Sequence, residues 1–265
     1  MTTIIKSNKT FTGSRSLGAL SSVTQTPQEI YDAYAARVTA DGGTIGDPIA
    51  TLAAITAAYN TDYLRRSAIA VSPRWGYKAT GSQLTKLYNL AGLIDGVCTT
   101  GVLLDTSAGH NRIDFTSSGS ITFSNTKILN GNGLAVALNG NSAGQVRCAF
   151  TPSGGLGWAI DQFGVAAVYE NLVQKFGSNP EYASTAEQAH AILIEQAEKR
   201  ITGVRDGLPM KAVTAVFTAL TSGATANVVF NRVSGTTSKV PELWYLNNAS
   251  IDSAMSISFD LGARY

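Results

Sequence analysis

The spacing of apolar residues changes near residue 97, and this change limits the possible folds more than any other feature of the sequence. Before it, apolar residues recur every three or four positions, which is typical of helices. After it, apolar and polar residues alternate through RIDFTSSGSITFSNTKIL, which predicts strands with one buried face. Helices and strands thus fall into separate blocks, and we predict an α+β fold rather than a regular βαβ alternation.

A helical hairpin is predicted in the first block. TPQE at 26–29 combines a capping threonine, a proline suited to the first turn and a glutamate that can bond back to the cap. Gly42 and Gly43 end this helix, and GDP at 46–48 begins the next one. So short a joint predicts two antiparallel neighbours. A further short helix is predicted over Gln83–Leu93.

The second block is predicted to be mainly strand, with helices inserted at about 156–203. Ser184 and Glu187 have the spacing of a second capping box within that insertion, and Gly203 is its predicted end. Four strand-like segments follow: KAVTAVFTAL, ATANVVFNRV, VPELWYL and AMSISFDL. We therefore expect an N-terminal helical region over 1–95 and a β-rich body over 96–265. That body would be an antiparallel β meander or sandwich with a central helical pair.

The composition favours a role in recognition or assembly. Charged residues make up 14% of the chain, whereas roughly 25% is usual. Surfaces with few long charged side chains suit close packing, because contact then costs less side-chain entropy and hydration. The net charge is only +2 and is scattered, so no specific binding to nucleic acid is expected. No apolar run approaches the ~20 residues of a membrane-spanning helix, so no membrane insertion is expected.

Motifs that could carry catalysis do not fit their required context. GNSAG at 140–144 spaces Ser142 like the nucleophile of a hydrolase, which needs a strand-to-helix turn. The following QVRCAF alternates like a strand, so we predict the tip of a β-hairpin there. The only histidines, His110 and His190, lack the spacing of a metal pair. We therefore predict no enzyme, no catalytic residue, no metal and no cofactor.

Two questions stay open at the level of sequence. A glycosidase pair could be drawn from the carboxylates Asp105, Asp114, Asp161, Glu170 and Glu181. Cys98 and Cys148 could form a disulfide if their strands are neighbours.

One stretch resembles a known set of proteins. YAARVTADGGTIGDP at Tyr34–Pro48, followed by LTKLYNLAGLIDGV and β-rich sequence, resembles tailed-bacteriophage virion structural proteins over about residues 28–100. These are tail-, neck- or head-associated parts. The resemblance implies a non-enzymatic virion component, assembled in the host cytoplasm, with the tail or neck favoured over capsid decoration. Its implied partners are copies of the same chain and other virion proteins.

Under that interpretation the helical hairpin is the docking element. The expected assembly contacts are its apolar positions and its joint: Ile30, Tyr34, Val38, Gly42, Gly43, Ile49 and Leu52. The alternative is a glycan-binding module for host attachment, which exposed Trp75, Tyr77 or Trp244 would support; a glycan hydrolase is a further alternative. A sandwich core would instead bury Trp244, Tyr245 and Phe259.

Overall fold

Four helices are present in the described part of the chain. The computed structural model describes residues 25–61, 63–116, 119–127, 133–139, 144–151, 157–160, 166–170, 173–176, 188–195, 198, 200–205, 208–209, 213–214, 225–235, 238–246 and 249–264. The helices are α1 (Pro27–Ala40), α2 (Pro48–Asn60), α3 (Tyr63–Arg66) and α4 (Ile251–Arg264). None of these described helices is long and apolar enough to span a bilayer.

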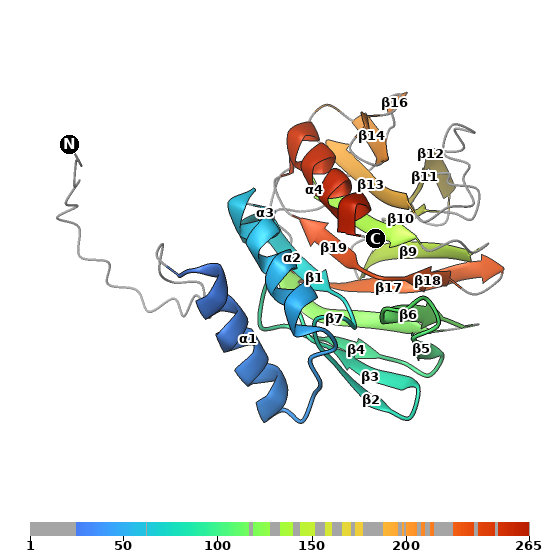
Figure 1. The fold of residues 1–265 in the computed structure, drawn as a ribbon. Coiled ribbons are helices and arrows are strands. Elements are labelled where there is room, and N and C mark those ends of the chain that lie inside the picture. The colour runs from blue at the N-terminus through green and yellow to red at the C-terminus, as the bar shows by residue number, and fades with distance from the viewer. Residues whose placement is uncertain are drawn as a thin grey trace, which may run out of the picture.

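A seven-stranded sheet lies beneath the helices (Figure 1). Its order is β1-β19-β8-β13-β14-β15, and β16 also pairs with β14. The strands are β1 (Ser67–Val71), β19 (Leu243–Leu246), β8 (Gly133–Asn139), β13 (Gln188–Glu195), β14 (Arg200–Arg205), β15 (Leu208–Pro209) and β16 (Val213–Thr214).

A twelve-stranded, curled sheet makes up the rest of the body. Its order is β12-β11-β10-β9-β17-β7-β4-β3-β5-β6-β18, with β2 paired to β3. The strands are β2 (Tyr77–Thr80), β3 (Gln83–Leu87), β4 (Gly96–Cys98), β5 (Val102–Asp105), β6 (Arg112–Phe115), β7 (Ser120–Lys127), β9 (Gly144–Thr151), β10 (Gly157–Ile160), β11 (Ala166–Glu170), β12 (Val173–Phe176), β17 (Thr225–Gly235) and β18 (Ser238–Val240). The described pairings are antiparallel, so the α+β prediction with an antiparallel body is confirmed at that level.

The helices form a layer on the seven-stranded sheet. Ala70 of β1, Trp244 of β19 and Ala191 of β13 belong to one buried cluster with the apolar faces of the helices. Alternate residues such as Leu243 and Tyr245 are also buried, and by the strand pleat they point to the opposite side, toward the larger sheet. The seven-stranded sheet is thus covered on both sides, which explains the unbroken apolar run of β19.

The predicted central helical pair at about 156–203 is wrong. Strands β10 to β14 occupy this range. β13 pairs along its length with β8 and β14, and Ala189, Ala191 and Leu193 face the helices with at most 1% exposure. Because both faces of this sheet are covered, the period of two is hidden in a continuous apolar run that spacing alone cannot distinguish from a helix.

The predicted helix at Gln83–Leu93 is also wrong, and a β-bulge explains the error. Lys86 pairs with Lys78 and Leu84 pairs with Ala79, so β3 carries an extra residue at Thr85. Leu84 and Leu87 are consequently both buried although they are three residues apart, a spacing that imitates a helix.

Two further predictions are wrong: the last predicted strand, and the hairpin formed by the two strands on either side of Ser142. The segment AMSISFDL, predicted as a strand, lies in α4, where Ala254 and Ile257 are buried one helical turn apart. β8 and β9 belong to different sheets, so they are not the two arms of the predicted hairpin. Ser142, between them, lies outside the described residues.

Candidate functional site: the seat of the N-terminal helix and the outer sheet face

The predicted helix boundaries in the hairpin are confirmed by its local contacts. The Glu29 backbone N–H donates to Thr26 Oγ1 at 3.2 Å, and the Thr26 N–H donates to Glu29 Oε2 at 2.7 Å. Asp47 caps α2 by accepting from the Ala50 N–H at 2.9 Å. Gly42 has a φ of +72°, a left-handed conformation that ends α1 and favours glycine.

Most of the apolar residues expected to contact other subunits are instead used within the chain. Ile30, Tyr34 and Val38 are 9%, 5% and 0% exposed and lie in the core cluster. A Cβ on Gly43 would lie 2.3 Å from the Tyr88 ring, so this glycine allows the helix joint to pack on that ring.

The other three expected contacts are more accessible. Leu52 is half-buried and Gly42 is exposed, and Ile49 is 84% exposed. Ile49 is thus the one large apolar side chain among the seven that stays available to a partner.

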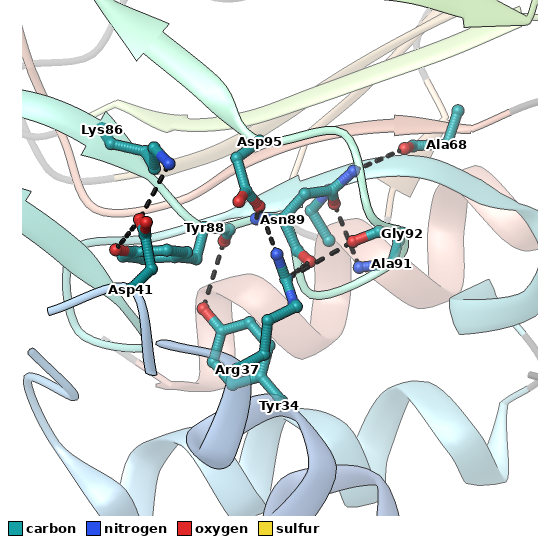
Figure 2. A network of polar contacts seen from close by, with 11 residues as sticks. Tyr34, Arg37, Asp41, Ala68, Lys86, Tyr88, Asn89, Ala91, Gly92 and Asp95 are labelled. Atoms are coloured by element: carbon teal, nitrogen blue, oxygen red, sulfur yellow. Dashed lines mark hydrogen bonds and ion pairs between the residues drawn. The ribbon is translucent and has the colours of Figure 1, made fainter. Parts of the chain in front are cut away.

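Polar contacts also hold α1 against β3 and the segment that follows it (Figure 2). Arg37 donates to the Asp95 carboxylate at 2.6 Å and to the Asn89 carbonyl at 2.7 Å. At the end of the helix, Asp41 accepts from Lys86 at 2.8 Å and from the Tyr88 hydroxyl at 2.6 Å. Both ends of this contact are charge-assisted, so the helix has a defined position on the body.

Asn89 is the centre of this network, and no pattern in the sequence indicates its role. Its Nδ2 donates to the Ala68 carbonyl at 2.9 Å, and its Oδ1 accepts from the N–H groups of Ala70 and Ala91 at 2.9 and 3.0 Å. The side chain therefore bonds β1, an edge strand, in the manner of a neighbouring strand. An edge occupied in this way cannot accept another chain at those positions.

The pKa values of the titratable groups in this network suit a structural role rather than proton transfer. Hydrogen bonds from Lys86 and Tyr88 lower the pKa of Asp41 to about 2. Burial raises the pKa of Tyr34, and burial followed by the nearby Asp41 raises the pKa of Tyr88. At neutral pH the carboxyl is ionised and both phenols are protonated, far from the conditions of a general acid or base.

A second feature is the outer face of the twelve-stranded sheet at β4, β7 and β17. Ile121, Phe123, Val228 and Phe230 are buried, so the alternate residues of these strands face outward. The register aligns Val97, Thr122 and Val229 in one row across the three strands. We call this row the Val–Thr–Val ladder; Val97 is 58% exposed in it.

A row of hydroxyl and amide groups lies beside the ladder. Ser120 is opposite Asn231, and its backbone N–H donates to Thr99 Oγ1 at 2.8 Å. The two hydroxyls of Thr99 and Ser120 are 3.2 Å apart and hydrogen-bonded. The alternation of Ile121 and Phe123 in the sequence was the signal that these small polar residues face outward.

Polar groups on this face are available to a ligand. No described residue forms a hydrogen bond with the hydroxyl of Thr122 or of Ser124. Asn231 Oδ1 also accepts no hydrogen bond from the described part of the chain, but this atom is buried and is therefore not itself available to a ligand. Groups of this kind normally find a partner, in the protein or in solvent and ligand.

Of the candidate glycosidase carboxylates, Asp105 is committed to ion pairs within the chain. Asp105 is ion-paired with Arg112 at 2.6 Å and Lys239 at 3.2 Å. Burial alone would raise its pKa, but hydrogen bonds from Ser107 and Arg112 outweigh this and lower the pKa to about 2. Such a carboxyl cannot serve as the general acid that glycoside cleavage requires. Asp161 and Glu181 lie outside the described residues.

The open question about the cysteines is answered by the sheet register. Cys98 is opposite Ile121, Ile121 opposite Phe230, and Phe230 opposite Cys148. Two strands separate the cysteines, so their Cα atoms lie about 14 Å apart, beyond the reach of a disulfide. Cys98 has a free thiol, and burial raises its pKa to about 12. In the described part of the chain no three His, Cys, Asp or Glu side chains group as metal ligands.

The tryptophans considered as glycan contacts are in the core. Trp75 and Trp244 are 1% and 0% exposed, and their rings pack edge to face at 5.3 Å. Tyr63 adds an edge-to-face contact to Trp244 at 5.2 Å. The core prediction for Trp244 and Tyr245 is confirmed, whereas Phe259 is 64% exposed on α4.

Comparison with known proteins identifies a fold and no family. No family model and no curated protein matches the sequence. The binding domain of botulinum neurotoxin serotype D has a similar structure, with a TM-score of 0.50, 9% identity, and coverage of 75% of this chain and 51% of that one. The receptor-binding domain of botulinum neurotoxin type G has a TM-score of 0.50 and 9% sequence identity, and the match covers 74% of this chain and 51% of that one. A sialidase of Trypanosoma rangeli in complex with 2,3-difluorosialic acid has a TM-score of 0.49 and 11% sequence identity, and the match covers 82% of this chain and 40% of that one. The chain therefore spans about half the length of the toxin domains that it matches.

Proposed function

We propose that this chain is a non-enzymatic glycan-binding module, and that it binds through the outer face of the twelve-stranded sheet. The observation that carries the proposal is the Val–Thr–Val ladder: an available Thr122 hydroxyl between two valines, beside the row of Ser120 and Asn231. Sugars present hydroxyl groups at their edges and C–H groups on their faces. A surface with both kinds of group side by side suits such a ligand.

The mode of binding follows from the shape and chemistry of this face. The register continues the ladder through Ala149 and Gly157 to Tyr169, so small residues separate the valines from an aromatic position. With few anchoring groups the affinity of one site is expected to be weak, with a Kd on the order of 1 mM.

The type G toxin domain is described as receptor-binding, which supports recognition as a use of this fold; the likeness extends to the fold alone. Host attachment by a virion would reconcile glycan binding with the resemblance of residues 28–100 to virion proteins. Several copies on one particle would then raise the weak affinity of a single site.

The test is a glycan array with the purified chain, displayed in many copies to compensate for weak binding. Thr122→Val replaces the hydroxyl by a methyl group of the same shape and removes no hydrogen bond to a described residue. Thr214→Val is the matched control, because Thr214 is an exposed strand threonine of the other sheet. We expect loss of glycan signal with the first variant and none with the second. If wild type binds no glycan, the proposal is wrong.

A virion structural role by self-assembly is the second candidate, with the tail or neck favoured. Four exposed apolar side chains favour it: Ile49 at the start of α2, and Leu93, Ile94 and Val97 around the start of β4, at 84%, 58%, 40% and 58% exposure. Light scattering over a concentration series tests it. Oligomers that dissociate in Ile49→Ser or Leu93→Ser would support assembly through these residues, and a strict monomer at every concentration would count against self-assembly.

A further inference from the structure

Seven adjacent strands of the twelve-stranded sheet contain basic residues and no acidic ones. They are β2, β3, β4, β7, β17, β9 and β10, and no Asp or Glu occurs within their bounds. Strand register places four of their basic residues on the outer face: Lys78 opposite Lys86, Lys86 opposite Val97, Arg147 opposite Asn231, and Lys127 opposite Thr225. The outer face is therefore basic along these strands.

Two ammonium groups share one carboxylate at the β2–β3 end of this face. The Asp41 carboxylate accepts from Lys86 at 2.8 Å and from the Tyr88 hydroxyl at 2.6 Å (Figure 2). Lys78 donates to the backbone carbonyl of the same aspartate at 2.7 Å, and no second carboxylate of the described residues pairs with it. At neutral pH two ammonium groups and one carboxylate leave one positive charge in excess.

Lys78 is accessible to a ligand that lies on the Val–Thr–Val ladder. Its side chain is exposed, and the Asp41 carbonyl takes only one of the three donors of the ammonium group. Lys86, Val97 and Thr122 continue from Lys78 in one row across the strands. From the spacing of strands, the Cα of Lys78 lies about 10 Å from that of Val97 and about 14 Å from that of Thr122. A cation thus lies at one end of the ladder.

We infer that the bound saccharide is acidic, with a carboxylate or sulfate group at Lys78 and its neighbouring units over the ladder; this inference rests on the proposed function. The anionic group gains a charge-assisted hydrogen bond from Lys78. The neighbouring units contact Val97 and hydrogen-bond with Thr122. The other basic positions of the face attract the anion at longer range and raise its rate of association.

NMR titration tests the inference with a matched pair of probes. One is the acidic oligosaccharide with the strongest signal on the array, and the other is its neutral form, made by carboxyl reduction or by desulfation. We expect the acidic probe to bind about threefold to fivefold more tightly, which is the size of an exposed charge contact. This preference should shrink between about 0.05 M and about 0.5 M NaCl, because salt screens charge interactions and leaves the neutral probe unaffected.

Three variants locate the anionic group. Lys78→Gln removes the charge but keeps a donor for the Asp41 carbonyl, so it should abolish the preference and leave the Kd of the neutral probe unchanged. Lys78→Arg keeps the charge and should keep the preference. Arg66→Gln is the control, because it removes the same charge from an exposed position on α3 and should change neither Kd.

The outcomes separate the inference from the proposed function. An array with neutral signals only, or equal affinity for the two probes, would overturn the inference and leave glycan binding intact. A preference for the acidic probe that persists in Lys78→Gln would place the anionic group elsewhere and overturn the inference as well. Absence of binding to any glycan would overturn both.

Discussion

Replacing Asn89 with alanine should weaken the attachment of the segment after β3, on which α1 packs, to the edge strand β1. Asn89 is 1% exposed and its side chain makes three hydrogen bonds to backbone groups. The substitution leaves the N–H groups of Ala70 and Ala91 and the carbonyl of Ala68 without their partner. The two N–H groups belong to buried residues, so water does not readily replace the lost bonds.

The magnitude follows from these three groups. A buried polar group left without a partner costs about 1–3 kcal/mol. Ala68 is only half-buried, so its carbonyl can be hydrated and contributes little. The two N–H groups then give a destabilisation of about 2–5 kcal/mol, a large part of the 5–15 kcal/mol typical of a folded domain. Asn89→Asp should cost at least as much, because it loses the donor and adds a carboxylate close to Asp95, which accepts from the Asn89 N–H at 2.9 Å.

Urea unfolding measures the free energy, and hydrogen exchange locates the effect. The Ala70 and Ala91 amides should lose protection in Asn89→Ala before the amides of β7 do. Asn60→Ala is the control, since Asn60 is exposed at the end of α2 and should change stability by about 0.5 kcal/mol or less. A loss below about 1 kcal/mol in Asn89→Ala, with normal protection of Ala70, would refute the reasoning.

Three further predictions concern other parts of the fold. Gly43→Ala should destabilise the protein by about 1–3 kcal/mol in urea unfolding, because the new Cβ overlaps the Tyr88 ring. In the control Gly92→Ala the new Cβ meets its nearest neighbour at 3.4 Å, so the loss of stability should be smaller, and equal losses would contradict the prediction. The ionised, ion-paired Asp105 has a lowered pKa, so the stability that it contributes to the fold is present above about pH 4 and is lost as pH falls toward 2. Asp105→Asn should flatten this part of the profile of unfolding free energy against pH, and an unchanged profile would count against the prediction. The Cys98 thiol, with its pKa raised to about 12, should react with iodoacetamide at pH 8 far more slowly in the native protein than in urea, as peptide mass spectrometry can show; equal rates would mean that the thiol is accessible.

The parts of the fold that were predictable are those defined by local contacts. The capping box of Thr26 and Glu29 and the cap at Asp47 lie within three residues of the groups that they bond, so the hairpin could be recognised from its sequence. The strands β6 and β7 were recognisable because one face of the larger sheet is open, which preserves the alternation of Ile121 and Phe123.

The errors arose where distant contacts override local preference. β13 contains helix-favouring Ala, Leu and Glu, yet backbone pairing on both sides keeps it extended. Leu84 and Leu87 share a face because of a bulge against β2, a strand pairing that spacing does not reveal. The candidate site followed the same pattern: the outward position of Thr122 could be predicted, whereas the alignment with Val97 and Val229 depends on three strands meeting in register.

By itself, the sequence determined the helical hairpin, the α+β class and the antiparallel, glycine- and hydroxyl-rich body, because caps, turns and alternation act between residues close along the chain. Only the tertiary structure decided what those elements do. Pairing across two sheets buried Trp75 and Trp244 and converted predicted helices to strands, and packing made Ile30, Tyr34 and Val38 internal contacts rather than a docking surface. Burial and strand register are set by partners far apart in the sequence, and these also decided which side chains remain outside for a ligand.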